Sequence, residues 1–484
     1  MARTLSTTAP GSMAAATITA VRSPRTRAGS PVNRPAFDAF VAEVFEGLPR
    51  ADQRRWAHVY TRGLLVTPGR KTVRRLAASV SDSATAAQAL HQFVNASPWS
   101  WEPVRARLAD WVVRRSRPRA LVIGVAVLPK RGDRSCGVHR RFVPQGGRTV
   151  NCQVGIGAFL ATDDATLPVG WRLFLPGPWS EDRELRGRAR VPEGAPGTRG
   201  PADAQVLDLV DGAGRNVTDP AADGLPVVAD LAGFADATAL VGGLVARRRR
   251  FVVSVPGDLV VLPDRAAPGT SGSRAGSGPV RARDLLAAHL ARPPLRPPTA
   301  AAVVTGGATG VVRLPGVPVP LRLIGGRGPD GSGGGRIWLT DLVDRPPREV
   351  WATAGLSTGA ADTMEHLAED FGLRAFEGRS YPGWHHHMTL VSAAFAYGAL
   401  GSTAPPAAPV RSAHGPRAGR PPRGARSTAG PARGPAGPAR GSAGSSPEAS
   451  SRAPSAPSRA PSAPTRSTTA PSRTLPTPTR TECS

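Results

Sequence analysis

The sequence is poor in cysteine and has no long apolar run. Its three cysteines, Cys136, Cys152 and Cys483, show no CxxC spacing, so a structural zinc site or a disulfide framework is not expected. No run of about 18 apolar residues occurs, which argues against a membrane-spanning helix. The N-terminus also lacks the continuous apolar segment of a secretory signal. We therefore expect a soluble cytoplasmic protein without a membrane partner.

Lysine is almost absent, although the chain is strongly basic. Only Lys71 and Lys130 occur among 62 basic residues, and with 35 acidic residues the formal net charge is +27. Such a surface attracts phosphate backbones and favours a nucleic-acid partner. An excess of Arg, Ala, Gly and Pro also arises in weakly constrained proteins of GC-rich genomes. Both explanations of the charge stay open at this point.

Composition and periodicity divide the chain into four parts. Residues 1–34 and 401–484 are rich in Pro, Ser, Ala and Arg, and we expect two disordered basic tails. Residues 35–117 have apolar residues at helical spacing, which predicts an all-helical N-terminal domain. The predicted helical stretches are 37–48, 52–65, 72–80, 84–95 and 102–115. Residues 118–400 mix strand-like and helical segments and predict an α/β domain.

The α/β part begins with strands that we expect to pair in an antiparallel way. Strand-like segments occur at 121–128, 151–162, 170–176, 224–234 and 250–256. A helix is predicted at 236–247, and residues 264–298 are rich in Pro, Gly, Arg and Ser and predict a loop. Short strands are expected within 300–343. Two helices are predicted to follow, at 359–371 and 385–400.

Seven strings of the chain are informative together. They are RGLL (62–65), GRKTV (69–73), LHQFVNASPW (90–99), NCQVGIGAFLA (151–161), GWRLFLPGPWSED (170–182), VVADLAGFAD (227–236) and FEGRSYPGWHHHMTLVSAAFAY (376–397). In this order they resemble one family, the bacterial insertion-sequence transposases of the Asp-Asp-Glu (DDE) superfamily, also called DDE superfamily endonucleases. The resemblance covers residues 36–400 and leaves the C-terminal tail outside.

The resemblance implies a ribonuclease-H-like fold, which is a mixed sheet flanked by helices. A β-rich insertion is expected at about 257–350, before the last catalytic helix. The helical segment 35–117 would recognise transposon ends, so DNA is the implied partner, and a homodimer is compatible with the resemblance. Three carboxylates of the family hold two divalent ions, for which carboxylate oxygens suit Mg²⁺. The expected cofactor is Mg²⁺ if catalysis survives, and otherwise none.

The carboxylate positions of the family are largely empty in this chain. Gly124 and Val125 stand where the first strand of the family carries its aspartates, and neither side chain has an oxygen that could bind a metal. Asp230 matches the second carboxylate and is the one clear metal ligand. Ala361 stands at the position of the third. The nearest acidic substitutes for the third are Asp362 and Glu365.

Basic residues around this position are candidates for contact with DNA phosphates. Four of the candidates, Lys130, Arg131, Arg140 and Arg141, lie with Arg134 in a predicted basic loop after the first strand. Arg379 is the fifth candidate. It stands two residues after Glu377, and an ion pair between Glu377 and Arg379 is the alternative interpretation.

Three adjacent histidines, His385, His386 and His387, suggest a metal site. Adjacent residues on a helix point about 100° apart, so three in a row cannot face one ion. We therefore expect them to cap and pack a helix. A zinc hydrolase that uses these histidines with Asp230 is the competing interpretation.

Three hypotheses for function follow. The first is a degenerate transposase that binds DNA and has largely lost metal-dependent cleavage and strand transfer. The second is a non-catalytic DNA-binding protein derived from a transposase, such as a regulator. The third is a still-active enzyme that combines Asp230 with Asp362 or Glu365 and with acidic residues near the first strands. Those acidic residues are Asp133, Asp163 and Asp164.

Overall fold

The computed structural model describes residues 33–143, 147–194, 198–216, 224–264, 278–290, 307–326 and 335–401. The chain divides into two units, Met1–Val410 and Arg411–Ser484, and every described residue belongs to the first. Apart from residues 33, 34 and 401, the two predicted disordered tails lie outside the described residues. Most of the predicted loop at 264–298 also lies outside them.

Five helices form the N-terminal part, as the periodicity predicts. They are α1 (Arg34–Val44), α2 (Ala51–Val66), α3 (Val73–Val80), α4 (Ala86–Asn95) and α5 (Trp101–Arg115). The side chain of Asn33 caps α1, and that of Thr72 caps α3, since each oxygen accepts from a free backbone N–H of the first turn. α1, α2, α4 and α5 contact α14 (Tyr381–Leu400), and α3 packs against α2 and α4.

A mixed sheet forms the centre of the α/β part. Its strands are β1 (Ala120–Pro129), β2 (His139–Val143), β3 (Arg148–Ala161), β4 (Thr166–Leu173), β5 (Val227–Ala229) and β6 (Phe251–Val255). β3 pairs antiparallel with β1, β2 and β4, whereas β1, β5 and β6 run parallel. Three antiparallel strands followed by two parallel ones give the order β4-β3-β1-β5-β6. This is the ribonuclease-H-like arrangement, so the predicted fold class is confirmed.

The β-rich insertion extends the same sheet beyond β6. Its strands are β7 (Val260–Pro263), β8 (Val280–Arg281), β9 (Gly307–Arg313), β10 (Leu321–Gly326) and β11 (Ile337–Thr340). β11 pairs antiparallel with β6, and the order continues as β11-β10-β9-β7-β8. The insertion is therefore joined to the parallel strands by backbone hydrogen bonds and is positioned directly beside them.

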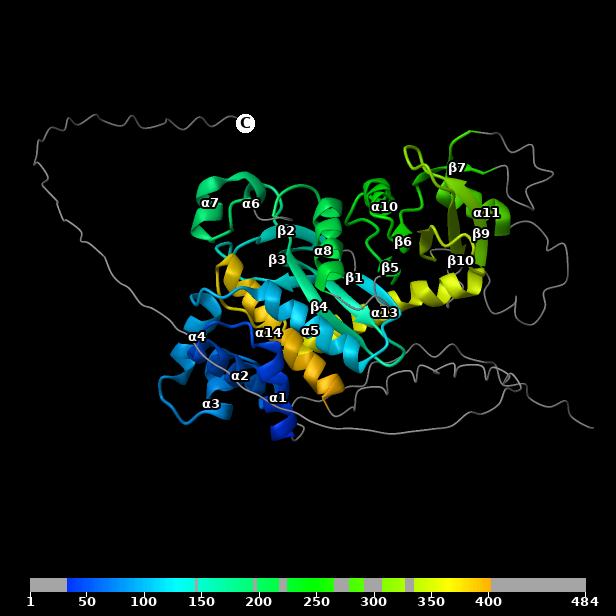
Figure 1. Ribbon diagram of the computed structural model, residues 1–484. Helices are drawn as coiled ribbons and strands as arrows, with labels where there is room; N and C mark the ends of the chain where they lie inside the picture. Colours follow the sequence, from blue (N-terminus) through cyan, green and yellow to red (C-terminus); the bar gives the residue numbers. More distant parts are fainter. Residues whose placement is uncertain are drawn as a thin grey trace, which may run out of the picture. The chain divides into compact units, whose positions relative to one another are not determined.

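Helices cover both faces of the sheet (Figure 1). α13 (Pro347–Asp370) packs over β1 at Gly124, and α14 packs over β3 at Gly155, since a Cβ atom built on either glycine would contact a side chain of that helix. A methyl group on Gly170 would meet α8 (Ala202–Asn216), beside which α10 (Ala237–Ala246) packs. Because side chains alternate between the two faces of a strand, α13 and α14 lie on one face and α8 on the other. Three short helices complete the described set: α6 (Pro178–Glu181), α7 (Arg183–Arg188) and α11 (Ala282–Leu290).

Three sequence predictions need correction. α11 lies inside the stretch predicted as a loop, where Leu286 packs against β10 at Gly325. α13 begins at Pro347 and not near 359, and the strand expected at 224–234 has only three residues. α11 and α13 pack against strands of the sheet, and such tertiary packing overrides local composition.

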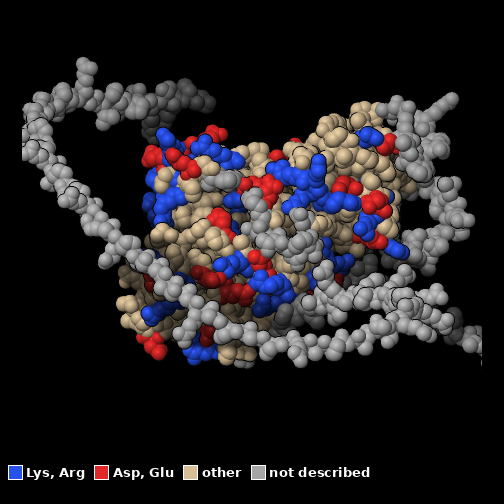
Figure 2. All heavy atoms as spheres, viewed as in Figure 1, with Lys and Arg blue, Asp and Glu red and all other residues tan. Residues whose placement is uncertain are grey.

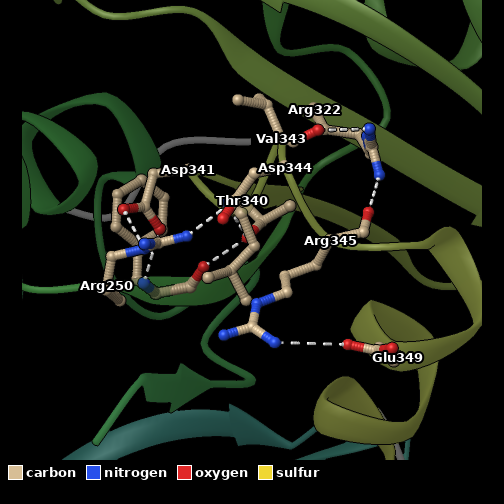
Figure 3. A network of polar contacts seen from close by, with 10 residues as sticks. Arg250, Arg322, Thr340, Asp341, Val343, Asp344, Arg345 and Glu349 are labelled. Atoms are coloured by element: carbon tan, nitrogen blue, oxygen red, sulfur yellow. Dashed lines mark hydrogen bonds and ion pairs between the residues drawn. The ribbon is translucent and has the colours of Figure 1, made fainter. Parts of the chain in front are cut away.

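A polar network fixes the junction between β6, β11 and the start of α13 (Figure 3). Arg250 pairs with Asp341 at 3.1 Å and with Asp344 at 2.7 Å. Asp341 also accepts a hydrogen bond from the backbone N–H of Phe251 at 2.8 Å, and Thr340 donates to the carbonyl of Phe251 at 2.5 Å. These bonds lock the register in which β11 joins the parallel strands.

Candidate functional site

The sheet register brings Gly124 and Asp230 together. In the parallel pair of β1 and β5, Ile123 is opposite Ala229. The residues that come next are Gly124 in β1 and Asp230 directly after the end of β5. Residues in register on neighbouring parallel strands point to the same face. The carboxylate that the family carries on the first strand would therefore stand beside Asp230, as the resemblance implies.

The space above Gly124 is filled by Met364 of α13. A Cβ built on Gly124 would lie 3.0 Å from the Met364 Cε atom and 3.7 Å from the ring of Phe159. The neighbouring Val125 is a partly buried apolar residue packed against the core. This part of β1 therefore faces a thioether and an aromatic ring, and it offers no oxygen ligand.

Asp230 is held by an arginine of the insertion. Its Oδ2 atom lies 3.0 Å from Arg336 Nη1, and the Asp230 side chain is 24% exposed. The turn that follows is fixed by Ser254 of β6, whose hydroxyl accepts from the backbone N–H groups of Leu231 and Ala232 at 2.9 and 3.1 Å. The carboxylate is thus well positioned, but its charge is balanced by a guanidinium.

One stripe of α13 carries the third family position. Ala361, Met364 and Ala368 are spaced by three and four residues and share one side of the helix, and Met364 is the residue over Gly124. Ala361 is exposed, and so are the two acidic neighbours Asp362 and Glu365. Neither carboxylate has an ion pair or side-chain hydrogen bond in the described part of the chain.

These residues do not fit a two-metal centre. In the part of the chain that the structure describes, no group of three or more His, Cys, Asp or Glu residues is arranged to hold a metal ion. Asp163 pairs with Arg119 at 2.5 Å, and its turn, which also holds Asp164, adjoins the start of β1. Asp133 lies beyond the end of β1. Among the described residues, Asp230 is the acidic residue that the sheet register places beside Gly124, whereas the resemblance implies three carboxylates.

The three histidines of α14 serve the packing of the helix. His385 Nδ1 lies 3.1 Å from Arg105 Nη2, His386 contacts the carbonyls of Val94 and Trp99 at 2.8 Å each, and His387 contacts the hydroxyl of Tyr60 and the carbonyl of Gly372 at 3.0 Å each. All three rings are buried. Since each ring goes to different neighbours, the three do not converge on one ion.

Burial keeps these histidines uncharged. It lowers the pKa of His386 to about 4 and that of His387 to about 4, although hydrogen bonds to backbone carbonyls act in the opposite direction. The pKa of His385 is also lowered, first by burial and then by the charge of Arg105. The histidine cluster therefore stabilises the fold in its uncharged form, and the stability of the fold should depend on pH.

A basic hollow opens at the end of β1, with a volume of about 830 Å³. It is lined by the turn between α2 and α3, by the loop after β1 and by the segment after α13. Five exposed arginines come from these three segments: Arg70, Arg131, Arg134, Arg374 and Arg379. Among the described residues, none of the five has an ion pair or a side-chain hydrogen bond.

Both lysines of the chain also line the basic hollow. Lys71 is 2% exposed and donates to the carbonyls of Leu64, at 2.7 Å, and Thr67. Lys130 donates to the carbonyl of Phe376 at 2.6 Å. Burial lowers the pKa of Lys71 to about 8 and that of Lys130 to about 8. Both ammonium groups are thus held by backbone carbonyls at the wall of the basic hollow.

Three acidic residues, Asp133, Glu369 and Glu377, share the basic hollow with seven basic ones. Glu377 and Arg379 are both exposed and form no ion pair with each other, so the alternative interpretation of this pair does not describe the structure. The hollow therefore keeps an excess of positive charge that is available to a ligand.

The other two predicted DNA contacts lie elsewhere. Arg140 and Arg141 belong to strand β2, not to a loop, and neither lines the basic hollow. Arg141 lies over the ring of Phe234 at 5.0 Å, in the turn that follows Asp230. Arg140 and Arg141 are near Lys130 in sequence, which is why one basic loop was expected. In the structure they are part of β2, which pairs with β3, and they lie away from the basic hollow.

Four residues that the structure brings to the site are not among the predicted ones. Arg70 and Arg374 line the basic hollow, Arg336 pairs with Asp230, and Met364 covers Gly124. A signal was present for the first two, since Arg70 stands in GRKTV and Arg374 stands just before FEGRS. No local signal marks Arg336 or Met364.

Comparison with known proteins places the chain in a family. Within the described residues, no helix combines the length and the apolar character needed to cross a membrane. A search of curated proteins finds no match. The family model described as DDE superfamily endonuclease matches residues 43–305, which is more than half of the chain. The protein therefore belongs to the DDE superfamily endonucleases, a family that acts on DNA and typically uses divalent metal ions.

Proposed function

We propose that this protein is a DNA-binding member of the DDE superfamily, of the insertion-sequence transposase type, that has lost metal-dependent strand cleavage and transfer. One observation carries the proposal. At the β1 position beside Asp230 the chain has Gly124, and Met364 occupies the space above it. A carboxylate is absent there, and the space it would need is filled.

The chemistry of phosphate attack supports the loss. In-line displacement at a phosphodiester needs positive charge on the attacked group and on the leaving oxygen, and this family supplies it with metal ions. Here the one carboxylate at the family position, Asp230, is paired with Arg336. The charge of Asp230 is thus balanced within the protein. The exposed Asp362 and Glu365 lie on α13 without a carboxylate opposite them on β1.

The basic hollow supports continued DNA binding. It adjoins the former catalytic elements, because Pro129 at the end of β1 and Ala368 on the Met364 stripe of α13 both line it. Exposed, unpaired arginines neutralise phosphates and release counterions, which gives affinity for nucleic acid. Lys130, Arg131 and Arg379 are the three predicted contacts that lie there, while Arg140 and Arg141 would extend the contact along β2.

A cleavage assay tests the catalytic half of the proposal. Supercoiled DNA that carries the flanking sequences of the gene is incubated with Mg²⁺ or Mn²⁺ and the wild-type protein, Asp230→Ala or Asp82→Ala. Asp82 is an exposed aspartate outside the site and gives the matched control. We expect no metal-dependent product from any of the three. Nicking that disappears in Asp230→Ala but persists in Asp82→Ala would show that an active site survives.

A binding assay tests the other half. Affinities for a duplex with those flanking sequences and for a scrambled duplex are measured over a range of stated salt concentrations, since affinity without the salt concentration cannot be interpreted. We expect binding that weakens steeply with salt. A large ratio of specific to non-specific affinity would favour a regulator built on this scaffold. No measurable binding at low salt would contradict the proposal.

A further inference from the structure

We propose that the basic hollow binds a compact, multiply charged phosphate group, namely the terminal phosphate of a nucleotide, either at a strand end or on a free nucleotide. The inference deepens the proposed function and rests on it, in that it takes nucleic acid as the partner. It goes further by assigning the hollow to a terminal phosphate and not to the continuous backbone of a duplex.

The first step is that the arginines of the basic hollow have no acidic partners among the described residues. Five of them converge on one hollow from three separate segments, and none is neutralised by a described partner. Elsewhere in the described residues, several arginines pair with acids, as Arg172 does with Asp208 and Arg247 with Asp211. Figure 2 shows basic and acidic side chains interspersed on one face of the molecule. Converging cations that outnumber the acidic residues around them, here seven against three, repel one another, so an anion would stabilise the arrangement.

The second step is the chemistry of the donors. Each guanidinium carries five N–H donors in a planar fork that matches two oxygens of one phosphate. Lys130 uses one donor on the carbonyl of Phe376, and an ammonium has three. Carboxylate ligands of the protein are few, since only Asp133, Glu369 and Glu377 line the hollow. The donor set therefore selects a phosphate and disfavours a metal ion.

The third step is size and charge. A volume of about 830 Å³ is within the range of sites for small molecules, roughly 300–1,000 Å³. A group that projects from a strand end, or a free nucleotide, can enter such a hollow, whereas the sides of a duplex meet a protein along an extended surface. A terminal phosphate carries a charge of about −1.5 to −2 at pH 7, against −1 for each phosphate within a strand. The excess of basic groups suits the more highly charged group.

The fourth step is that the frame of the hollow is fixed. The loop after β1 is bonded to the segment after α13 through Lys130 Nζ to the carbonyl of Phe376 at 2.6 Å and Cys136 N to the carbonyl of Arg379 at 3.0 Å. Gly372, which ends α13 with φ +75°, approaches Lys71 so closely that a Cβ there would lie 2.6 Å from the Lys71 Cβ. The three segments are thus held together before a ligand arrives, which lowers the entropic cost of binding.

The test compares the same labelled oligonucleotide with a terminal phosphate and with a terminal hydroxyl, at the 5′ and at the 3′ end. Two further ligands are used: a covalently closed duplex, which has no ends, and free deoxyadenosine monophosphate as a competitor. The variants are Arg131→Gln, Arg374→Gln and Arg379→Gln. Arg348→Gln is the matched control, because Arg348 is exposed and lies about 30 Å from Ala368 along α13 at 1.5 Å per residue.

With the wild-type protein we expect the terminal phosphate to improve affinity about tenfold, as one charge-assisted contact would. Each hollow variant should bring this ratio close to one, and Arg348→Gln should leave it unchanged. Competition by the free nucleotide at similar concentration would identify a nucleotide as the ligand, and absence of competition would identify a strand end. Melting temperatures of the variants should match the wild type, since exposed substitutions change stability little.

Two outcomes separate this inference from the proposed function. Equal affinity for closed duplex and phosphorylated ends, unchanged in the hollow variants, would overturn the inference and leave DNA binding intact. Binding of the free nucleotide that depends on Arg131 and Arg379, without any binding of DNA, would support the terminal-phosphate site and contradict the proposed function.

Discussion

Two hollows in the described part of the chain are each lined by several arginines, and they differ in whether these arginines have partners. The smaller one, of about 350 Å³, lies where α13 begins and is lined by Arg119, Arg250 and Arg345. Each of the three is paired with an acid, as Figure 3 shows for two of them. The pairs are Arg119–Asp163, Arg250–Asp341, Arg250–Asp344 and Arg345–Glu349. In the larger basic hollow, none of the five arginines has a described partner.

In a chain with a net charge of +27, the presence of an arginine does not by itself indicate a binding site, because nearly all basic residues are arginines. What distinguishes the arginines is whether each has an acidic partner. Paired arginines join elements of the fold, whereas unpaired arginines that converge on one hollow leave positive charge for a ligand. This distinction can be tested by experiment, and so can the buried histidines, from which the fold excludes charge.

The largest effect should come from acidification. His386 and His387 have a pKa of about 4 in the folded protein against about 6.5 when exposed. Stability from these groups is therefore complete above about pH 6.5 and is lost as the pH falls toward 4, because only the unfolded chain takes up the protons. By pH 4.5 the loss should be about 2–3 kcal/mol for each histidine. Urea unfolding at several pH values measures it.

The matched variants for this experiment are His387→Gln and His91→Gln. His91 is an exposed residue of α4 outside the cluster. His387→Gln should reduce the pH-dependent part of the unfolding free energy by roughly the share of one histidine, and His91→Gln should leave it unchanged. If His387→Gln shows the same pH dependence as the wild type, the histidines are not the groups that the fold keeps uncharged.

The second prediction compares an acid that pairs with an arginine of the smaller hollow with an acid that lines the basic hollow. Asp341 accepts from Phe251 N and pairs with Arg250, so Asp341→Ala leaves a part-buried N–H without its partner and should lower the free energy of unfolding by about 2–3 kcal/mol. Glu369 lines the basic hollow without a described partner, so Glu369→Ala should change it by less than about 0.5 kcal/mol. Chemical denaturation measures both. Equal effects would remove the distinction between the two regions.

The third prediction restores the missing carboxylate. Gly124→Asp should destabilise the protein by about 2 kcal/mol, because the new side chain meets Met364 at 3.0 Å in a packed site and overpacking is costly. Gly132→Asp is the control, since a side chain there meets nothing within 4 Å. Adding Met364→Ala to Gly124→Asp should recover part of the loss. A harmless Gly124→Asp substitution, shown by an unchanged melting temperature, would mean that the site is still open.

Much of the scaffold could be predicted from the sequence because it follows local rules. The five N-terminal helices follow from apolar periodicity. The antiparallel start of the sheet follows from the strand-like runs around 121–128 and 151–162. The position of Asp230 beside Gly124 follows from the order of the strings, which fixes the strands that pair. α11 was missed because the Pro- and Gly-rich flanks hide nine helical residues whose stability comes from packing on the insertion strands.

The candidate site was predicted only in its parts. Arg70, Arg131 and Arg374 are far apart in sequence and meet because α2, β1 and α13 end at the same place. Arg336 reaches Asp230 across 106 positions of the chain, through the pairing of β11 with β6. Periodicity and composition describe single segments, whereas these contacts depend on the sheet order. Whether an arginine has an acidic partner therefore depends on the fold and cannot be predicted from the local sequence.

The smallest effect, and the most direct test of the comparison, concerns single arginines in DNA binding. Arg131→Gln removes an unpaired cation from the basic hollow, and Arg345→Gln removes one that is paired with Glu349 at 3.7 Å. Both substitutions change the net charge equally, so a model in which only total charge matters predicts equal losses of affinity for DNA.

If the pairing of the arginine decides its effect, Arg131→Gln should reduce the slope of log affinity against log salt by about one, with a modest loss of affinity. Arg345→Gln should leave the slope unchanged, because its charge is already balanced. Equal slopes for the two variants would show that DNA senses the overall charge of the protein and that the unpaired arginines have no special part in binding.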